Sequence, residues 1–131
     1  MAQNTSEPPS TQKKRILVVD DDQAVLTSTV RVLDKSGFEA DTAQTGQEAI
    51  EKSKQQHYDA ALIDLKLPDM DGIAVLSKAD FSSTVKIMLT GYPSLVSGLA
   101  AMERGVDAYL HKPVRPEELI LLVKSKLSQK K

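Results

Sequence analysis

The chain has 131 residues, enough for one domain built around a single hydrophobic core. A formal net charge of −1 gives the domain no electrostatic basis for binding nucleic acid directly. The lack of cysteine excludes disulfide bonds and thiolate metal sites and fits a reducing compartment. No apolar run approaches the roughly 20 residues of a membrane span, and the polar start of the chain does not resemble a signal peptide. We therefore expect a cytoplasmic protein without membrane insertion.

After a polar start, strand and helix signals alternate five times along the chain. Residues 1–13 are rich in Ser, Thr, Gln and Pro, which predicts a disordered N-terminal tail ahead of a domain over residues 14–128. The expected strands cover residues 16–19, 38–42, 59–63, 85–89 and 107–110. The expected helices begin near residues 23, 47, 73, 93 and 116. Pro93 suits the first turn of the fourth helix.

The pattern within the strands indicates how they are arranged. The first and third expected strands are continuously apolar, which is typical of central strands buried on both faces of a parallel sheet. The second alternates between apolar and polar residues, as a half-exposed edge strand does. Right-handed crossovers between parallel strands place helices on both faces of the sheet. We predict an α/β fold, a (βα)5 doubly wound sheet of five parallel strands.

Polar side chains follow four of the expected strands, at or just past the point where each strand ends. They are Asp20, Asp21, Asp22, Asp64, Thr90 and Lys112. In open α/β sheets, ligands bind outside the carboxyl ends of the strands, so we expect these groups at one edge of the sheet. Carboxylates, a hydroxyl and an ammonium together suit a divalent cation and a phosphoryl group.

The acids allow both a functional and a structural interpretation. Three adjacent carboxylates repel one another unless a cation is present, and Mg²⁺ is usually held by one or two carboxylates. We assign Mg²⁺ binding to Asp20 and Asp21, whereas Asp22 suits the N-cap of the first helix. Asp64 alone could be another cap or a loop acid. Together with the other strand-end residues it is the best candidate for a nucleophile that attacks phosphorus.

Thr90 and Lys112 are also open to two interpretations. Thr90 could be an ordinary β-branched strand residue, but a hydroxyl facing Asp64 would donate a hydrogen bond to a phosphoryl oxygen. Lys112 could be a surface charge, or it could supply a mobile point charge for phosphate. Pro113 biases Lys112 toward an extended backbone, which keeps it out of a helix.

Four segments that carry these residues resemble the receiver domain of two-component response regulators. They are ILVVDDD (16–22), ALIDLKLPDMDG (61–72), IMLTGY (87–92) and DAYLHKP (107–113). The resemblance covers about residues 14 to 127, and five motif elements occur in the family's order. It implies the flavodoxin-like fold with strand order 2-1-3-4-5.

The resemblance implies a phosphoacceptor site. Asp64 corresponds to the phosphoacceptor, which receives its phosphoryl group from a sensor histidine kinase or a histidine phosphotransfer protein. Asp20, Asp21 and Asp64 correspond to the Mg²⁺ acids, with the backbone carbonyl of Lys66 as a further ligand. Such a module catalyses only its own phosphorylation and dephosphorylation and is not an enzyme with a separate substrate.

The resemblance also implies a conformational switch. Thr90 and Lys112 correspond to the phosphate-binding pair, and Tyr109 to the aromatic residue that turns inward when Thr90 moves toward the phosphoryl group. In the family, a cis peptide bond joins the lysine to the residue that corresponds to Pro113. Lys66 lies two residues after Asp64, in a position that influences how readily water attacks the acyl phosphate.

The fourth and fifth helices each have an apolar face, and the fifth has apolar residues outside that face as well. Leu95 and Leu99 share the face of the fourth helix with Met102. Ile120 and Leu121 lie outside the apolar face of the fifth helix, and contiguous exposed apolar residues tend to mark an interaction surface. In the family, the surface of helix four, strand five and helix five pairs with a second copy or a target. Ordinary scatter of apolar surface residues is the alternative interpretation.

Two other functions compete with the receiver. A haloacid-dehalogenase-like phosphatase also combines acids, a Thr and a Lys on a parallel sheet, with its aspartate nucleophile after strand one. Asp64 on the third strand and the small size of the chain argue against it. A protein-binding module with a vestigial site is the second alternative, and the complete set of site residues argues against it. The sequence identifies neither the cognate kinase nor the output.

Overall fold

The computed structural model describes residues 13–129, so the disordered tail predicted for residues 1–13 lies outside them except for Lys13. Five parallel strands form one sheet in the order β2-β1-β3-β4-β5, which confirms the predicted fold class and strand order. The strands are β1 (Arg15–Val19), β2 (Glu39–Ala43), β3 (Ala60–Asp64), β4 (Val85–Thr90) and β5 (Ala108–His111). The helices are α1 (Gln23–Lys35), α2 (Gly46–Gln55), α3 (Gly72–Lys78), α4 (Leu95–Glu103) and α5 (Pro116–Gln129).

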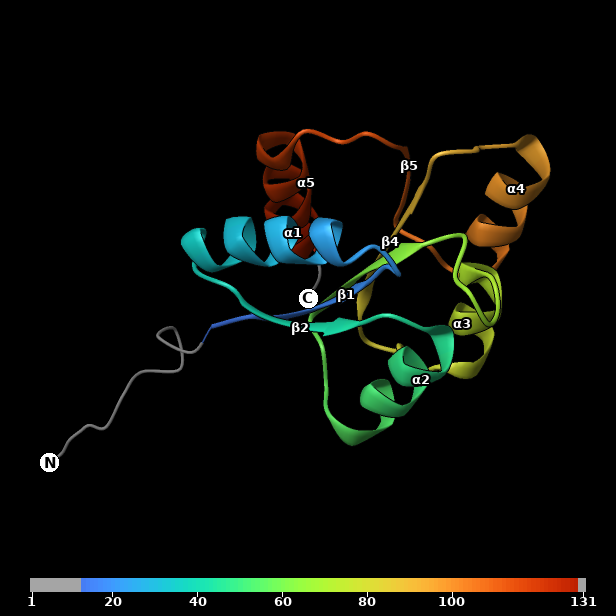
Figure 1. Cartoon of the computed structure of the whole chain (residues 1–131), viewed down its shortest axis with the longest axis horizontal. Helices are drawn as coiled ribbons and strands as arrows, with labels where there is room; N and C mark the ends of the chain where they lie inside the picture. The colour runs from blue at the N-terminus through green and yellow to red at the C-terminus, as the bar shows by residue number, and fades with distance from the viewer. Residues whose placement is uncertain (1–12, 130–131) are drawn as a thin grey trace, which may run out of the picture.

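The sheet separates two apolar layers, and alternate residues of each central strand face opposite layers. Ile16 and Val18 of β1 pack with α1 and α5, whereas Leu17 and Val19 pack with α2 and α3. Figure 1 shows α1 and α5 together on one side of the sheet and α2 and α3 on the other. Both faces of β1 and β3 are covered, which explains their continuously apolar sequences. Of the helices in residues 13–129, none is long and apolar enough to cross a bilayer.

Polar caps and glycines set the ends of the helices. Asp22 caps α1, since its carboxylate accepts hydrogen bonds from two N–H groups of the first turn. Ser94 caps α4, so Pro93 lies just before the helix and not in its first turn as expected. Gly37 and Gly105 have φ of 92° and 80° just past the ends of α1 and α4. This left-handed conformation favours glycine and stops each helix.

The prediction that Ile120 of α5 belongs to an exposed interaction surface was wrong. Ile120 is only 8% exposed and packs in the same layer as Leu26 and Leu33 of α1. The helix lies against both the sheet and α1, so it buries a wider apolar stripe than the sequence periodicity indicates. Leu121 is 69% exposed and therefore remains available at the surface.

The larger group of exposed apolar side chains lies on α4. Only Ala101 of this helix is buried. The face shared by Leu95, Leu99 and Met102 points to solvent, because the small residues of α4 face the sheet. We call the exposed apolar residues of this helix the α4 surface: Leu95, Val96, Leu99 and Met102.

Gly72→Ala should lower the melting temperature by several degrees, because Gly72 packs against the backbone that precedes the site. An added Cβ would lie 2.8 Å from the carbonyl oxygen of Asp64 and 3.0 Å from Cε of Met88. Overpacking of this kind costs roughly 1–3 kcal/mol, whereas helix propensity alone would favour alanine. Thermal unfolding followed by circular dichroism measures the change.

Gly91→Ala is the matched control for Gly72→Ala. A Cβ on Gly91 would meet no heavy atom within 4 Å, so this variant should unfold close to the wild-type temperature. Equal melting temperatures for Gly72→Ala and the wild type would contradict the close packing beside Asp64.

Candidate functional site

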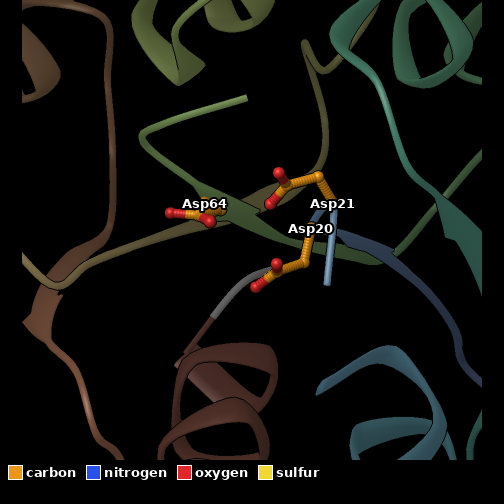
Figure 2. A group of neighbouring side chains, drawn as sticks. All are labelled: Asp20, Asp21 and Asp64. Atoms are coloured by element: carbon orange, nitrogen blue, oxygen red, sulfur yellow. The ribbon is translucent and has the colours of Figure 1, made fainter. Parts of the chain in front are cut away.

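Three carboxylates meet where β1 and β3 end. Asp20 follows β1 directly and Asp64 is the last residue of β3, and the parallel register pairs Val19 with Ile63 just before them. One oxygen from each of Asp20, Asp21 and Asp64 lies within 4.8 Å of the other two. Figure 2 shows the three side chains gathered at this edge of the sheet. The structure therefore brings together the acids predicted to bind a metal.

Backbone contacts hold Asp20 in place and separate its role from that of Asp22. The backbone N–H of Asp20 donates to the carbonyl of Ala43 at 3.0 Å, which extends the pairing of β1 with β2. Its Oδ1 accepts a hydrogen bond of 2.9 Å from the N–H of Asp22. Asp22 turns its own carboxylate to the first turn of α1, which confirms its assignment as a cap.

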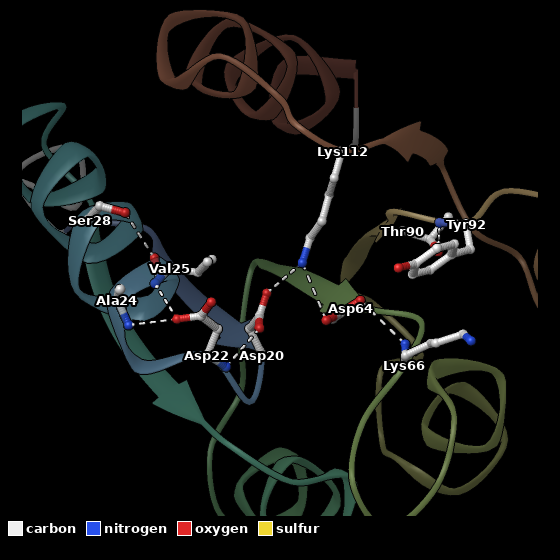
Figure 3. Close-up of polar contacts among 10 residues, drawn as sticks. All are labelled: Asp20, Asp22, Ala24, Val25, Ser28, Asp64, Lys66, Thr90, Tyr92 and Lys112. Carbon is white, nitrogen blue, oxygen red and sulfur yellow. Dashed lines mark hydrogen bonds and ion pairs between the residues drawn. The ribbon is translucent and has the colours of Figure 1, made fainter.

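Lys112 joins two of the acids across the sheet. Its Nζ lies 2.8 Å from Oδ2 of Asp20 and 3.3 Å from Oδ2 of Asp64. Figure 3 shows the side chain extending from the end of β5 to both carboxylates. The N–H of Lys112 donates to the carbonyl of Thr90 at 2.8 Å, which fixes the start of the side chain. The peptide bond between Lys112 and Pro113 is cis, as the resemblance implied.

Burial and charge act against each other at this site. Asp20 and Asp64 are 4% and 9% exposed. Burial raises the pKa of the Asp64 carboxyl above its ordinary value, while the Lys112 ammonium opposes the shift and the Asp20 carboxylate adds to it. Burial alone would lower the pKa of Lys112, but the hydrogen bond and charge of Asp20, together with Asp64, outweigh burial and raise it. The ammonium therefore stays charged at neutral pH.

The donor set fits a hard divalent cation. Asp20, Asp21 and Asp64 offer carboxylate oxygens, the ligand type that Mg²⁺ prefers. Three carboxylates face one ammonium, so a bound divalent cation would offset the remaining negative charge.

Thr90 and Lys66 lie at the same edge of the sheet. Thr90 is the last residue of β4 and is fully buried, and its Oγ1 accepts a hydrogen bond of 3.0 Å from the N–H of Tyr92. The hydroxyl keeps its own proton to donate. The N–H of Lys66 donates to Oδ1 of Asp64 at 3.3 Å. The Nζ of Lys66 lies 4.9 Å from the centroid of the Tyr92 ring.

Tyr109 is bound to α4. Its hydroxyl forms a hydrogen bond with Oγ of Ser97 and accepts a longer one, of 3.4 Å, from the N–H of Ser94. Its ring lies 3.6 Å from the position of a Cβ on Gly98. These contacts join β5 to the first turn of α4. The sequence contained no sign of these contacts.

Asp69 supports the site in a way that the sequence did not predict. Its two carboxylate oxygens accept hydrogen bonds of 2.8 Å and 2.9 Å from the N–H groups of Gly46 and Gln47. These bonds lower the pKa of Asp69 and fasten the loop that follows Asp64 to the start of α2. The only signal for Asp69 was its position among turn-forming residues.

Asp64→Asn should raise the melting temperature by a few degrees at neutral pH without divalent cations. Because burial raises the pKa of Asp64, its ionised form is less favourable in the folded than in the unfolded chain. Lys112 keeps Asp20 as a partner at 2.8 Å, so the substitution leaves no isolated buried charge. The wild type should lose stability relative to the variant as pH rises through the range just above 3.8, the ordinary pKa of the group. Thermal unfolding from about pH 3 to about pH 8 measures this difference.

Two controls accompany this measurement. Asp34→Asn, on the exposed side of α1, should change the melting temperature little. Millimolar Mg²⁺ should raise the melting temperature of the wild type more than that of Asp64→Asn, since the variant offers one carboxylate fewer. A lower melting temperature for Asp64→Asn at neutral pH without Mg²⁺ would contradict the dominance of burial.

The chain matches known proteins over nearly its whole length. The sequence profile of the response regulator receiver domain matches residues 16–124. Transcriptional regulatory protein SrrA of Staphylococcus aureus is 38% identical over 113 residues, which cover 86% of this chain and 47% of SrrA. The CheY-like response regulator receiver domain protein from Methanospirillum hungatei JF-1 is 42% identical, with a TM-score of 0.88 over 91% of this chain and 97% of that one. A two-component response regulator from Clostridium difficile is 28% identical, with a TM-score of 0.84 over 89% and 98%.

The matched residues include the carboxyl ends of all five strands, where the acids, Thr90 and Lys112 lie. The chain spans about half the length of the curated relatives it matches. On the family profile, the relatives and the fold, the chain belongs to the response regulator receiver domain family of two-component systems.

Proposed function

We propose that this receiver accepts a phosphoryl group on Asp64 from a sensor histidine kinase or a histidine phosphotransfer protein. The observation that carries the proposal is the position of Asp64 at the end of β3, beside Asp20, Asp21 and the ammonium of Lys112. A carboxylate oxygen of Asp64 attacks phosphorus, the P–N bond to the donor histidine breaks, and its electron pair returns to the imidazole. The product is an acyl phosphate.

The neighbouring residues have distinct roles in this proposal. Asp20, Asp21 and Asp64 would hold Mg²⁺, with the backbone carbonyl of Lys66 as a further ligand, and the cation would supply positive charge beside the transferring group. Lys112 can turn from its carboxylate partners to the phosphoryl oxygens while it keeps its charge. Thr90 donates its hydroxyl proton to a phosphoryl oxygen.

The family is a signalling module, and this role differs from turnover of a separate substrate. Neither the fold nor the family match supports the haloacid-dehalogenase-like alternative. The chain's own phosphorylation and dephosphorylation are the only reactions we propose for it. The cytoplasmic location expected from the sequence stays a prediction.

Tyr109 contacts the first turn of α4 through Ser97 and Ser94, so a change in Tyr109 acts directly on that helix. The four residues of the α4 surface are 53–80% exposed, and contiguous exposed apolar residues tend to mark an interaction surface. We propose that the α4 surface pairs with a second copy of the chain in the phosphorylated state.

Phosphorylation of Asp64 can be tested by intact mass. Incubation with acetyl phosphate and Mg²⁺ should add one phosphoryl group of about 80 Da to the wild type. Asp64→Asn should gain none, since its amide is not a nucleophile, and chelation of Mg²⁺ should suppress the adduct in the wild type. Asp34→Asn is the matched control and should be labelled like the wild type.

Two outcomes would contradict this assignment. An adduct that persists in Asp64→Asn would place the phosphoryl group on another residue. A wild type that gains no adduct and also fails to bind beryllofluoride, which mimics the acyl phosphate, would not be a working phosphoacceptor.

Leu99→Glu should weaken self-association of the beryllofluoride-bound chain about tenfold or more, since a buried unpaired charge opposes an apolar contact. Leu99 lies within the α4 surface, and Leu121 is an equally large exposed residue of α5, in the surface of α4, β5 and α5 expected from the sequence. Leu121→Glu should therefore weaken self-association as well. Gln55→Glu, on the exposed side of α2, is the control and should self-associate like the wild type. Sedimentation with and without beryllofluoride measures the association. A wild type that stays monomeric with beryllofluoride would contradict the proposed pairing.

A further inference from the structure

Two loops meet at the rim of the site, where the side chains of Lys66 and Tyr92 contact each other. Lys66 lies in the loop between β3 and α3, and Tyr92 in the loop between β4 and α4. The ammonium of Lys66 lies 4.9 Å from the centroid of the Tyr92 ring, within the range of a cation–π interaction. Figure 3 shows this pair beside Asp64 and Thr90. Tyr92 is 73% exposed, so its ring is not needed for the core.

The backbone of each loop residue also holds a reacting or phosphate-binding group. The N–H of Lys66 donates to Oδ1 of Asp64 at 3.3 Å. The N–H of Tyr92 donates to Oγ1 of Thr90 at 3.0 Å. The contact of the Lys66 ammonium with the ring therefore completes a chain of contacts from Asp64 to Thr90 through the two loops.

The ring is a weak partner for the Lys66 ammonium. Among the ion pairs within residues 13–129, Lys66 has no carboxylate partner, in contrast to Lys112. An exposed cation–π contact is much weaker than a charge-assisted hydrogen bond to a phosphoryl group that carries a charge near −2. A phosphoryl group on Asp64 would be held two residues away from Lys66 and would compete directly for its ammonium.

We propose that the ammonium of Lys66 exchanges the Tyr92 ring for the phosphoryl group on Asp64, so that Tyr92 restrains Lys66 before phosphorylation and is released by it. Lys66 is then a phosphoryl-binding residue, and Tyr92 is a positioning residue that acts through it. Because Tyr92 precedes Pro93 and the cap Ser94, its release frees the start of α4. This inference rests on the proposed function, since it requires a phosphoryl group on Asp64.

The proposed exchange predicts that substitutions of Lys66 and of Tyr92 change the affinity for beryllofluoride in opposite directions when Mg²⁺ is present. Lys66→Gln should weaken binding several-fold, because it removes a cation that contacts the bound group. Tyr92→Leu should strengthen binding, because Lys66 no longer leaves the ring in order to bind. In the Lys66→Gln background, Tyr92→Leu should have no effect, since the two residues act through one contact.

Conservative variants separate this role from a merely structural one. Lys66→Arg and Tyr92→Phe keep the charge and the ring, and both should bind beryllofluoride close to the wild-type affinity. Lys78→Gln, an exposed lysine at the end of α3, is the matched control and should bind like the wild type. Titration of the full chain with beryllofluoride, followed by amide NMR shifts, gives each dissociation constant.

The NMR spectrum also reports the contact itself. Ring currents of Tyr92 should shift the ε-protons of Lys66 upfield in the free chain, and beryllofluoride with Mg²⁺ should remove this shift. Tyr92→Leu should remove it without beryllofluoride.

The proposed exchange would be overturned if the effects of Lys66→Gln and Tyr92→Leu on beryllofluoride affinity were additive in the double variant. A weaker affinity of Tyr92→Leu for beryllofluoride would overturn it as well. So would an upfield shift of Lys66 that survives beryllofluoride binding. A wild type that binds no beryllofluoride at all would instead refute the proposed function, and the inference with it.

Discussion

The geometry of the site depends on the ion pairs that the ammonium of Lys112 forms with Asp20 and Asp64. This ammonium comes from the end of β5, an edge strand, and reaches Asp20 after β1 and Asp64 at the end of β3. Both carboxylates are nearly buried, and without a nearby cation their burial would favour protonation or an open site. One positive charge thus holds two strand ends together while the site remains negative enough for a divalent cation. The residue that we propose to bind the phosphoryl group therefore also stabilises the acids in its absence.

The parallel sheet is the reason that so few residues suffice to form the site. Every strand runs in the same direction, so every strand's last residue lies at the same edge, and each side chain needs only to follow its strand. The two apolar layers then fix the strands rigidly beneath the site. Close packing continues up to Asp64, since Gly72 leaves no space for a Cβ beside its carbonyl. At the rim, the ammonium of Lys66 lies over the ring of Tyr92, and the N–H of each residue donates to Asp64 or Thr90.

The sequence predicted the parts of the molecule that depend on local pattern. Apolar runs located the strands, and the residues after them located Asp20, Asp64 and Lys112 at one edge. It did not predict contacts between segments distant in the chain, such as Asp69 with the start of α2, because turn-forming residues carry no information about their partners. The burial of Ile120 depends on how α5 lies against α1, which helical periodicity on its own does not determine. The exposure of the α4 surface escaped prediction for the same reason, since an apolar helix face normally indicates core.

The segment from Thr90 to Ser94 connects the buried strand β4 to the largely exposed helix α4. Thr90 is fixed in β4 and fully buried, whereas four residues later Ser94 begins a helix with only one buried side chain. This helix is held by buried Ala101 and by the contacts of Tyr109 with Ser97 and Ser94. Small changes at Thr90 therefore meet little resistance in α4, while the well-packed layer of α1 and α5 resists them. The same weak packing that exposes apolar residues on α4 makes this helix the element best able to move when charge changes at Asp64.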